Sequence, residues 1–175
     1  MRAIATAWLL AAIGLWIVGA LAAWAPRGML PDPALLAAIA LGLHMPGLRG
    51  IIAAWGIGWQ QDLLSGGPMG VFALLQLLAW TVTRLGERQL ALARPVALVP
   101  FTAVLTIAQV MLVMGLAVGP RLDDPRTLPV LVVHALVNAL AAPFVSRLFD
   151  AAVGRVESPD ASRGGLRFDA GAPLR

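Results

Sequence analysis

Long apolar runs, separated by short polar or turn-rich connectors, fill the chain up to residue 150. The first run, residues 4–25, has 22 residues and no charge. At about 1.5 Å per helical residue it is long enough to cross a hydrocarbon core of about 30 Å. Residues 69–83, 96–118 and 128–149 are further apolar runs. The pattern predicts an all-α, polytopic membrane protein.

Two shorter apolar runs leave the number of spans open. Residues 34–45 and 50–61 each have 12 residues, which cover only roughly 18 Å as a helix. Pro46, Gly47 and Arg49 lie between them. The two runs form either one proline-kinked helix or two short, tilted helices that make a hairpin.

The distribution of arginines separates these two topologies. All 13 basic residues are arginines. A cytoplasmic corner at Arg49 gives six spans, with ten arginines inside and three, Arg27, Arg121 and Arg126, outside. A single span through residues 34–61 instead leaves three arginines inside, nine outside and Arg49 within the lipid. Because cytoplasmic loops carry an excess of Lys and Arg, the sequence predicts six transmembrane helices with both termini in the cytoplasm.

Composition agrees with this class of protein. Of the 175 residues, 59% are hydrophobic and 13% are charged, which indicates one membrane domain over residues 1–150. From Asp150 onward the chain is polar and lacks helical periodicity, so residues 151–175 are expected to form a disordered cytoplasmic tail. The absence of cysteine excludes disulfides and thiol chemistry. No basic run interleaved with aromatic residues indicates nucleic-acid binding.

A polar corner, GWQQDLLSGGPMG at residues 58–70, interrupts the apolar pattern. On the six-span topology Asp62 lies at the end of the third helix. The negative end of the helix dipole is unfavourable for a carboxylate there. The N–H groups of residues 65–69, however, are free to donate hydrogen bonds to it. This interpretation makes Asp62 a structural anchor for a helix end.

The turn residues fit the same interpretation, and two functional alternatives stay open. Ser65 can cap, Gly66 and Gly67 permit positive φ, and Pro68 suits the first turn of the next helix. An ionisable group at membrane depth costs at least ~2.5 kcal/mol and is by default a candidate site for an ion, a proton or a partner. Gln60 and Gln61 would then line the same polar cavity.

Polar side chains also recur at helical spacing in the later spans. Thr102, Thr106 and Gln109 share one helix face, and His134 and Asn138 lie one turn apart. Gln76 on the fourth span belongs to the same group of candidates. These residues either form hydrogen bonds between helices or line a ligand cavity.

No catalytic or nucleotide-binding motif occurs along the chain. His134 has no nucleophile or carboxylate near it in sequence. There is no G-x-S-x-G, no Walker loop, no H-E-x-x-H and no paired-carboxylate signature. The sequence therefore predicts a protein that is not an enzyme and needs no metal or cofactor.

Residues 31–75 resemble the core of the rod shape-determining protein MreD family. In that family an apolar span leads to a short basic corner, then to a Gly-x-x-x-Asp-Leu-x-Ser-Gly helix end, and then to a Gly-led helix. Gln60 and Gln61 stand where the family usually has apolar residues. The residues that match the pattern are Gly58, Asp62, Leu63, Ser65, Gly66, Pro68 and Gly70.

The resemblance implies a non-enzymatic component of the bacterial cell-elongation complex, located in the inner membrane. Its implied partners are a single-span MreC-like protein and, in a larger assembly, the MreB filament, the RodA glycosyltransferase and a penicillin-binding transpeptidase. The family is similar in architecture to the substrate-binding subunits of energy-coupling-factor transporters, so a vitamin-binding subunit is the alternative. Gly14, Gly19, Gly56 and Gly58 are expected to allow close approach of a partner helix.

Overall fold

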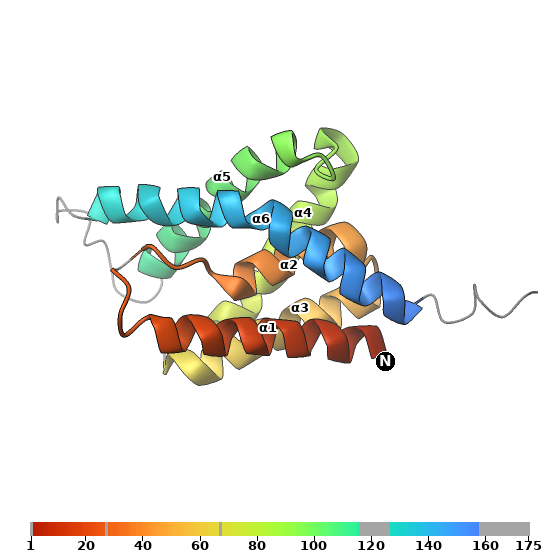
Figure 1. The fold of residues 1–175 in the computed structure, drawn as a ribbon, viewed down its shortest axis with the longest axis horizontal. Helices are drawn as coiled ribbons and strands as arrows, with labels where there is room; N and C mark the ends of the chain where they lie inside the picture. Colours follow the sequence, from red (N-terminus) through yellow and green to blue (C-terminus); the bar gives the residue numbers. More distant parts are fainter. Residues whose placement is uncertain (1, 27, 67, 116–126, 158–175) are drawn as a thin grey trace, which may run out of the picture.

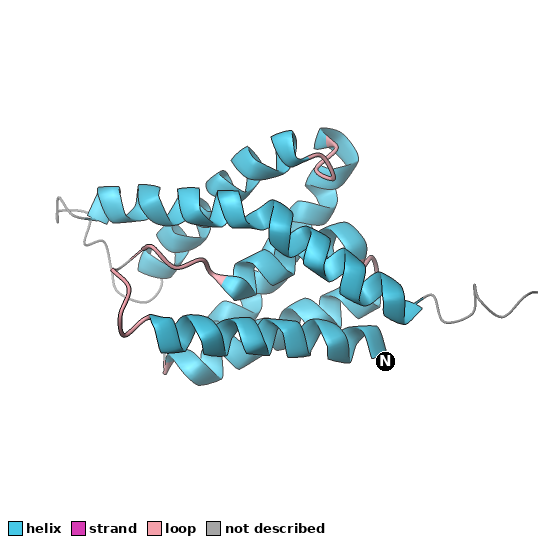
Figure 2. Cartoon of the chain, in the orientation of Figure 1, coloured by secondary structure: helices cyan, strands magenta, loops and turns pink. Residues whose placement is uncertain are grey.

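The computed structural model describes residues 2–26, 28–66, 68–115 and 127–157. These residues form helices and loops, with no strand among them (Figure 2). The all-helical prediction is confirmed, and residues 34–61 form two helices rather than one. The six helices are α1 (Arg2–Leu21), α2 (Pro33–His44), α3 (Leu48–Ser65), α4 (Val71–Leu90), α5 (Pro95–Val113) and α6 (Thr127–Glu157).

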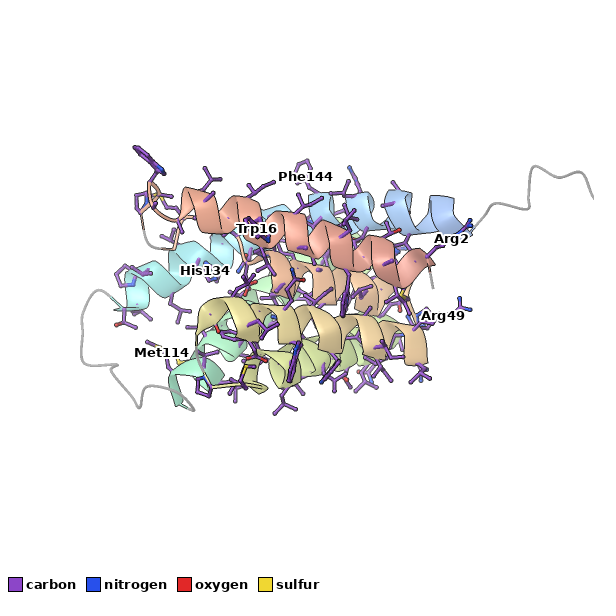
Figure 3. The ribbon with its side chains drawn as sticks, turned by 90° about the horizontal axis from the view of Figure 1, so that it is seen from below. Arg2, Trp16, Arg49, Met114, His134 and Phe144 are labelled. Atoms are coloured by element: carbon purple, nitrogen blue, oxygen red, sulfur yellow. The ribbon has the colours of Figure 1, made fainter. Side chains whose placement is uncertain are left out.

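Consecutive helices run in alternating directions (Figure 1). The start of α1 and the end of α6 consequently lie at the same end of the bundle. Arg2 and Arg49 are at this end, whereas Met114 lies towards the other (Figure 3). We call the end that carries Arg2, Arg49 and the α4–α5 connector the arginine end.

Helix α2 is the centre of the bundle. It packs against α1, α3, α4 and α6, and every residue from Ala34 to Leu43 is buried. A helix that is apolar on all sides is stable only when other helices enclose it. The short length of α2 is therefore compatible with a position in which lipid contacts little of it.

The outer helices expose their apolar side chains. Trp16 on α1, Val104 on α5 and Phe144 on α6 are among many large hydrophobic residues at the surface. Three helices, α1, α5 and α6, are long and apolar enough to cross a membrane. An apolar exterior around buried polar groups is the arrangement of a protein that lies in lipid.

Several helix boundaries differ from the predicted ones, most of all those of α4 and α6. Helix α4 starts at Val71 and continues to Leu90 rather than ending at residue 83. Helix α6 continues through Glu157, so the start of the expected polar tail is helical. Phe149 and Val153, one turn apart, are buried in a cluster with alanines of α1, and this contact stabilises the extension. The remainder of the predicted tail, residues 158–175, lies outside the described residues, as do residues 116–118 of the fifth span and Arg27, Arg121 and Arg126.

Three of the four glycines predicted to admit a partner helix are used inside the bundle. A Cβ at Gly56 would overlap the Trp8 indole of α1, and one at Gly58 would overlap the α4 backbone at Ala73. A Cβ at Gly14 would lie 2.9 Å from the Cβ of Pro33. Only at Gly19, of these four, is there open space. The prediction is therefore wrong for Gly14, Gly56 and Gly58, because close packing between this chain's own helices requires them.

Candidate functional site

Asp62 binds the N-terminus of the neighbouring helix α4. Its side chain is 1% exposed, in the last turn of α3. Oδ2 accepts hydrogen bonds from the N–H groups of Gly70, at 3.0 Å, and Ala73, at 3.1 Å. Oδ1 accepts one from the N–H of Phe72 at 2.9 Å. The carboxylate thus caps α4 from outside, where the cap residue Gly70 has no side chain to do so.

The donors to Asp62 differ from those that the sequence predicts. They belong to the first turn of α4 and not to residues 65–69. Pro68 precedes α4 instead of lying in its first turn, because Gly70 has a φ of +92° and the helix begins only after it. Gly66 ends α3 with a φ of +64°, and the Ser65 hydroxyl donates back to the Asp62 carbonyl at 3.1 Å.

A second polar centre forms around Asp32, at the start of the central helix α2. Oδ1 of Asp32 accepts hydrogen bonds from the N–H groups of Ala34 and Leu35 at 3.0 and 3.1 Å, so Asp32 is the N-cap of α2. Its own N–H donates to Asn138 Oδ1 of α6 at 2.7 Å. Gln109 Nε2 of α5 reaches Asp32 Oδ2 at 3.4 Å. Asp32 therefore ties α2 to both α5 and α6.

The hydrogen bonds of Asn138 fix the tautomer of His134. Because Asn138 Oδ1 accepts from Asp32, its Nδ2 must face Thr106 Oγ1 at 3.4 Å and His134 Nε2 at 3.2 Å. The Thr106 hydroxyl already donates to the carbonyl of Thr102 at 2.8 Å, which agrees with this orientation. An amide NH₂ can only donate, so Nε2 is the acceptor and Nδ1 carries the proton of the neutral ring.

Two glutamines extend the network into α3 and α4. Gln76 Nε2 donates to Gln61 Oε1 at 2.8 Å, and the Gln61 amide lies against the Asp32 carboxylate. Gln76 is fully buried, and its Oε1 has no partner among the described residues. The structure thus brings Gln61, Gln109, His134 and Asn138 together around Asp32. Gln60 is half-buried and does not line the cavity beside Asp32.

That cavity has a volume of about 390 Å³. Asp32, Gln61 and His134 supply its polar wall. Residues of the α1–α2 connector line it, and Gly28, with a φ of +85°, lies so close to Val130 that a Cβ there would be 2.9 Å from the Val130 carbonyl oxygen. The apolar lining comes from Leu15, Val18, Ala22, Ala25, Pro26, Gly28, Leu30, Pro31 and Pro33.

A separate apolar cleft lies between α4 and α5. These two helices pack on each other less than any other consecutive pair, and the cleft between them has a volume of about 240 Å³. Its one polar wall residue, Gln109, is buried, and Gln109 Oε1 has no partner among the described residues. The other lining residues are Leu75, Leu78, Ala79, Val82, Phe101, Val104, Leu105, Ala108 and Leu112.

A serine, a histidine and an aspartate also meet at the arginine end. His44 Nε2 lies 3.0 Å from Ser146 Oγ, and His44 Nδ1 lies 3.5 Å from Asp150 Oδ1. Acyl transfer needs a nucleophile that opens onto a cleft with oxyanion donors. The neighbouring pocket is lined by residues of the His44–Arg49 corner and does not include Ser146. The contact is best understood as a link between α2 and α6.

Asp32 is the principal residue that sequence reasoning missed. An aspartate followed by proline at the start of an apolar run is an N-cap signal, but it lay in a segment taken only as a connector. Among the described residues, no group of three His, Cys, Asp or Glu side chains is placed to hold a metal ion.

Comparisons of the chain with protein-family models, curated proteins and solved structures find no match.

Proposed function

We propose that this protein is a six-span scaffold of the MreD kind in the bacterial inner membrane. It acts without catalysis, as a component of the cell-elongation complex, and binds the transmembrane helix of a single-span MreC-like protein. RodA, the penicillin-binding transpeptidase and MreB belong to the larger assembly. The observation that carries the proposal is the apolar cleft between α4 and α5.

The chemistry of this cleft suits a transmembrane helix. Helices in lipid associate through close packing and interhelical hydrogen bonds, because lipid tails are as apolar as the side chains. Ala79 and Ala108 let a partner backbone approach between larger leucines. Gln109 Oε1 is an acceptor that the described part of the chain leaves unused. Because this atom is buried, a partner helix would satisfy it only by inserting a hydroxyl or amide donor into the cleft.

The arrangement of the ends supports the proposed membrane orientation. With the arginine end in the cytoplasm, Arg2 and Arg49 obey the positive-inside rule. Arg84 also belongs to this end, since it donates to the Gly42 carbonyl at 3.2 Å and pairs with Glu87. Both termini of the helical domain then face the cytoplasm, and the Asp32 and Asp62 centres lie towards the outer side.

A second candidate function is a small-molecule binding subunit of an energy-coupling-factor type transporter. The cavity beside Asp32 favours it, because a mainly apolar pocket with a few convergent polar groups is the usual form of a ligand site. If the protein is such a transporter subunit, no partner helix binds in the cleft between α4 and α5.

Depletion in a rod-shaped cell separates the two functions. The scaffold proposal predicts rounded, swelling cells that no vitamin restores. Complementation with Ala108→Trp, which fills the cleft, should fail, whereas Ala20→Trp on the exposed side of α1 should restore rods. Normal rods that require one vitamin for growth would refute the scaffold and support the transporter subunit.

A further inference from the structure

The cavity beside Asp32 presents a defined set of hydrogen-bonding groups. Asp32, Gln61 and His134 come from the α1–α2 connector, α3 and α6, and each is partly exposed where it lines the cavity. Other side chains of the network hold them in place. Asn138, which orients both Asp32 and His134, is fully buried.

The cavity offers both an acceptor and a donor. Asp32 Oδ1 is occupied by two backbone N–H groups, whereas the contact of Oδ2 with Gln109 is long, at 3.4 Å, and the Gln61 amide lies beside the carboxylate. A carboxylate oxygen can accept two hydrogen bonds. His134 Nε2 is engaged by Asn138, so its Nδ1–H is the nitrogen with donating capacity. The two groups line one space and complement each other.

The hydrogen-bonding capacities of Asp32 and His134 favour an uncharged ligand over a charged one. An anion would be repelled by the Asp32 carboxylate, and a cationic group has no acceptor for the Nδ1–H of His134. A hydroxyl group both donates and accepts, so it can donate to Asp32 Oδ2 while accepting from His134. The remaining walls are apolar and suit a hydrocarbon body. The volume of about 390 Å³ lies within the usual range of small-molecule pockets.

We propose that this cavity binds an uncharged, hydroxyl-bearing amphiphile, with its hydroxyl group between Asp32 and His134. The same chemistry occurs in a free alcohol and in the glycerol headgroup of a lipid. The site is distinct from the α4–α5 cleft and does not depend on the scaffold function.

Binding of 1,2-hexanediol to the full-length protein in phosphatidylcholine nanodiscs tests the proposal. Saturation-transfer NMR gives the dissociation constant, and 1,2-dimethoxyhexane serves as the matched probe that cannot donate. We expect saturable binding of the diol and about tenfold weaker binding of the ether, the effect of about one lost hydrogen bond.

Two variants one residue apart locate the site. Val18→Trp fills the cavity and should abolish diol binding, whereas Ile17→Trp, on the exposed face of α1, should leave it unchanged. His134→Phe should weaken it about tenfold by removing one donor. Melting temperatures of all variants show whether each is folded.

Nanodiscs that contain diacylglycerol, an uncharged lipid with a free glycerol hydroxyl, distinguish the two sources of the hydroxyl. Competition by this lipid assigns the site to a lipid headgroup, and equal binding in both discs assigns it to a free alcohol. Equal binding of the diol and the ether, or retained binding in Val18→Trp, would overturn the proposal.

Discussion

Removing the carboxylate of Asp62 should destabilise the fold more than any other single change at the corner. Three N–H groups of α4, on Gly70, Phe72 and Ala73, donate to it. In Asp62→Leu all three lose their acceptor. In Asp62→Asn the amide oxygen can keep the two donors that share Oδ2, while its NH₂ group faces the N–H of Phe72.

The three hydrogen bonds to Asp62 determine how much stability the substitutions should remove. A bond to a charged group contributes about 1.5–3 kcal/mol, so three give an upper limit of about 4.5–9 kcal/mol. Gly70 is partly exposed, so water replaces part of the loss. We expect Asp62→Leu to lower the free energy of unfolding by about 4 kcal/mol and Asp62→Asn by about 2 kcal/mol. The melting temperature should fall by about 8–16 °C and about 4–8 °C, respectively.

Thermal unfolding in detergent, followed by size-exclusion chromatography, measures these shifts. Asp150→Asn is the control, because its side chain is 69% exposed and its contact with His44 should be worth less than about 4 °C. If both Asp62 variants melted like the parent protein but lost function, Asp62 would be an ion or partner site and the anchor interpretation would fail.

Three further predictions concern topology, the network and one strained residue. Reporters fused after Pro68 should be extracytoplasmic and those after Arg88 cytoplasmic; a cytoplasmic signal at Pro68 would refute six spans. Asn138→Leu leaves three polar groups without their partner and should cost about 2 kcal/mol, or about 4–8 °C of melting temperature; an unchanged temperature would contradict the network. Ala91 ends α4 with a φ of +48°, so Ala91→Gly should raise the melting temperature by about 1–3 °C, and a decrease would exclude backbone strain there.

The helices were predictable because their signal is local. Apolar length and the arginine pattern gave all six segments, including the division at Pro46 and Gly47, where Gly47 has a φ of +74°. The end of α6 was not predictable, because Phe149 and Val153 extend it only through contact with α1. The packing role of the glycines was not predictable either, because it depends on tertiary contacts. Gly56, for example, accommodates Trp8, which lies far from it in sequence.

The two polar centres differ in how far the sequence could define them. Asp62 and its turn are close in sequence, so the role of a helix-end anchor could be proposed even though the donors lie several residues further on. Asp32 carries a local N-cap signal, but its contacts with Gln109 and Asn138 depend on how α5 and α6 pack around α2. The sequence of the α1–α2 connector alone does not predict how these helices pack.

Photo-crosslinking from the α4–α5 cleft in intact cells tests whether this cleft binds a partner helix. A photoreactive residue replaces Val104, which lines the cleft and is 68% exposed, or Phe144 on α6, which is 74% exposed and lies outside it. The account predicts that position 104 crosslinks to a single-span MreC-like protein and that position 144 does not. Failure of position 104 to crosslink to that protein, or equal adducts from both positions, would contradict a dedicated helix-binding cleft.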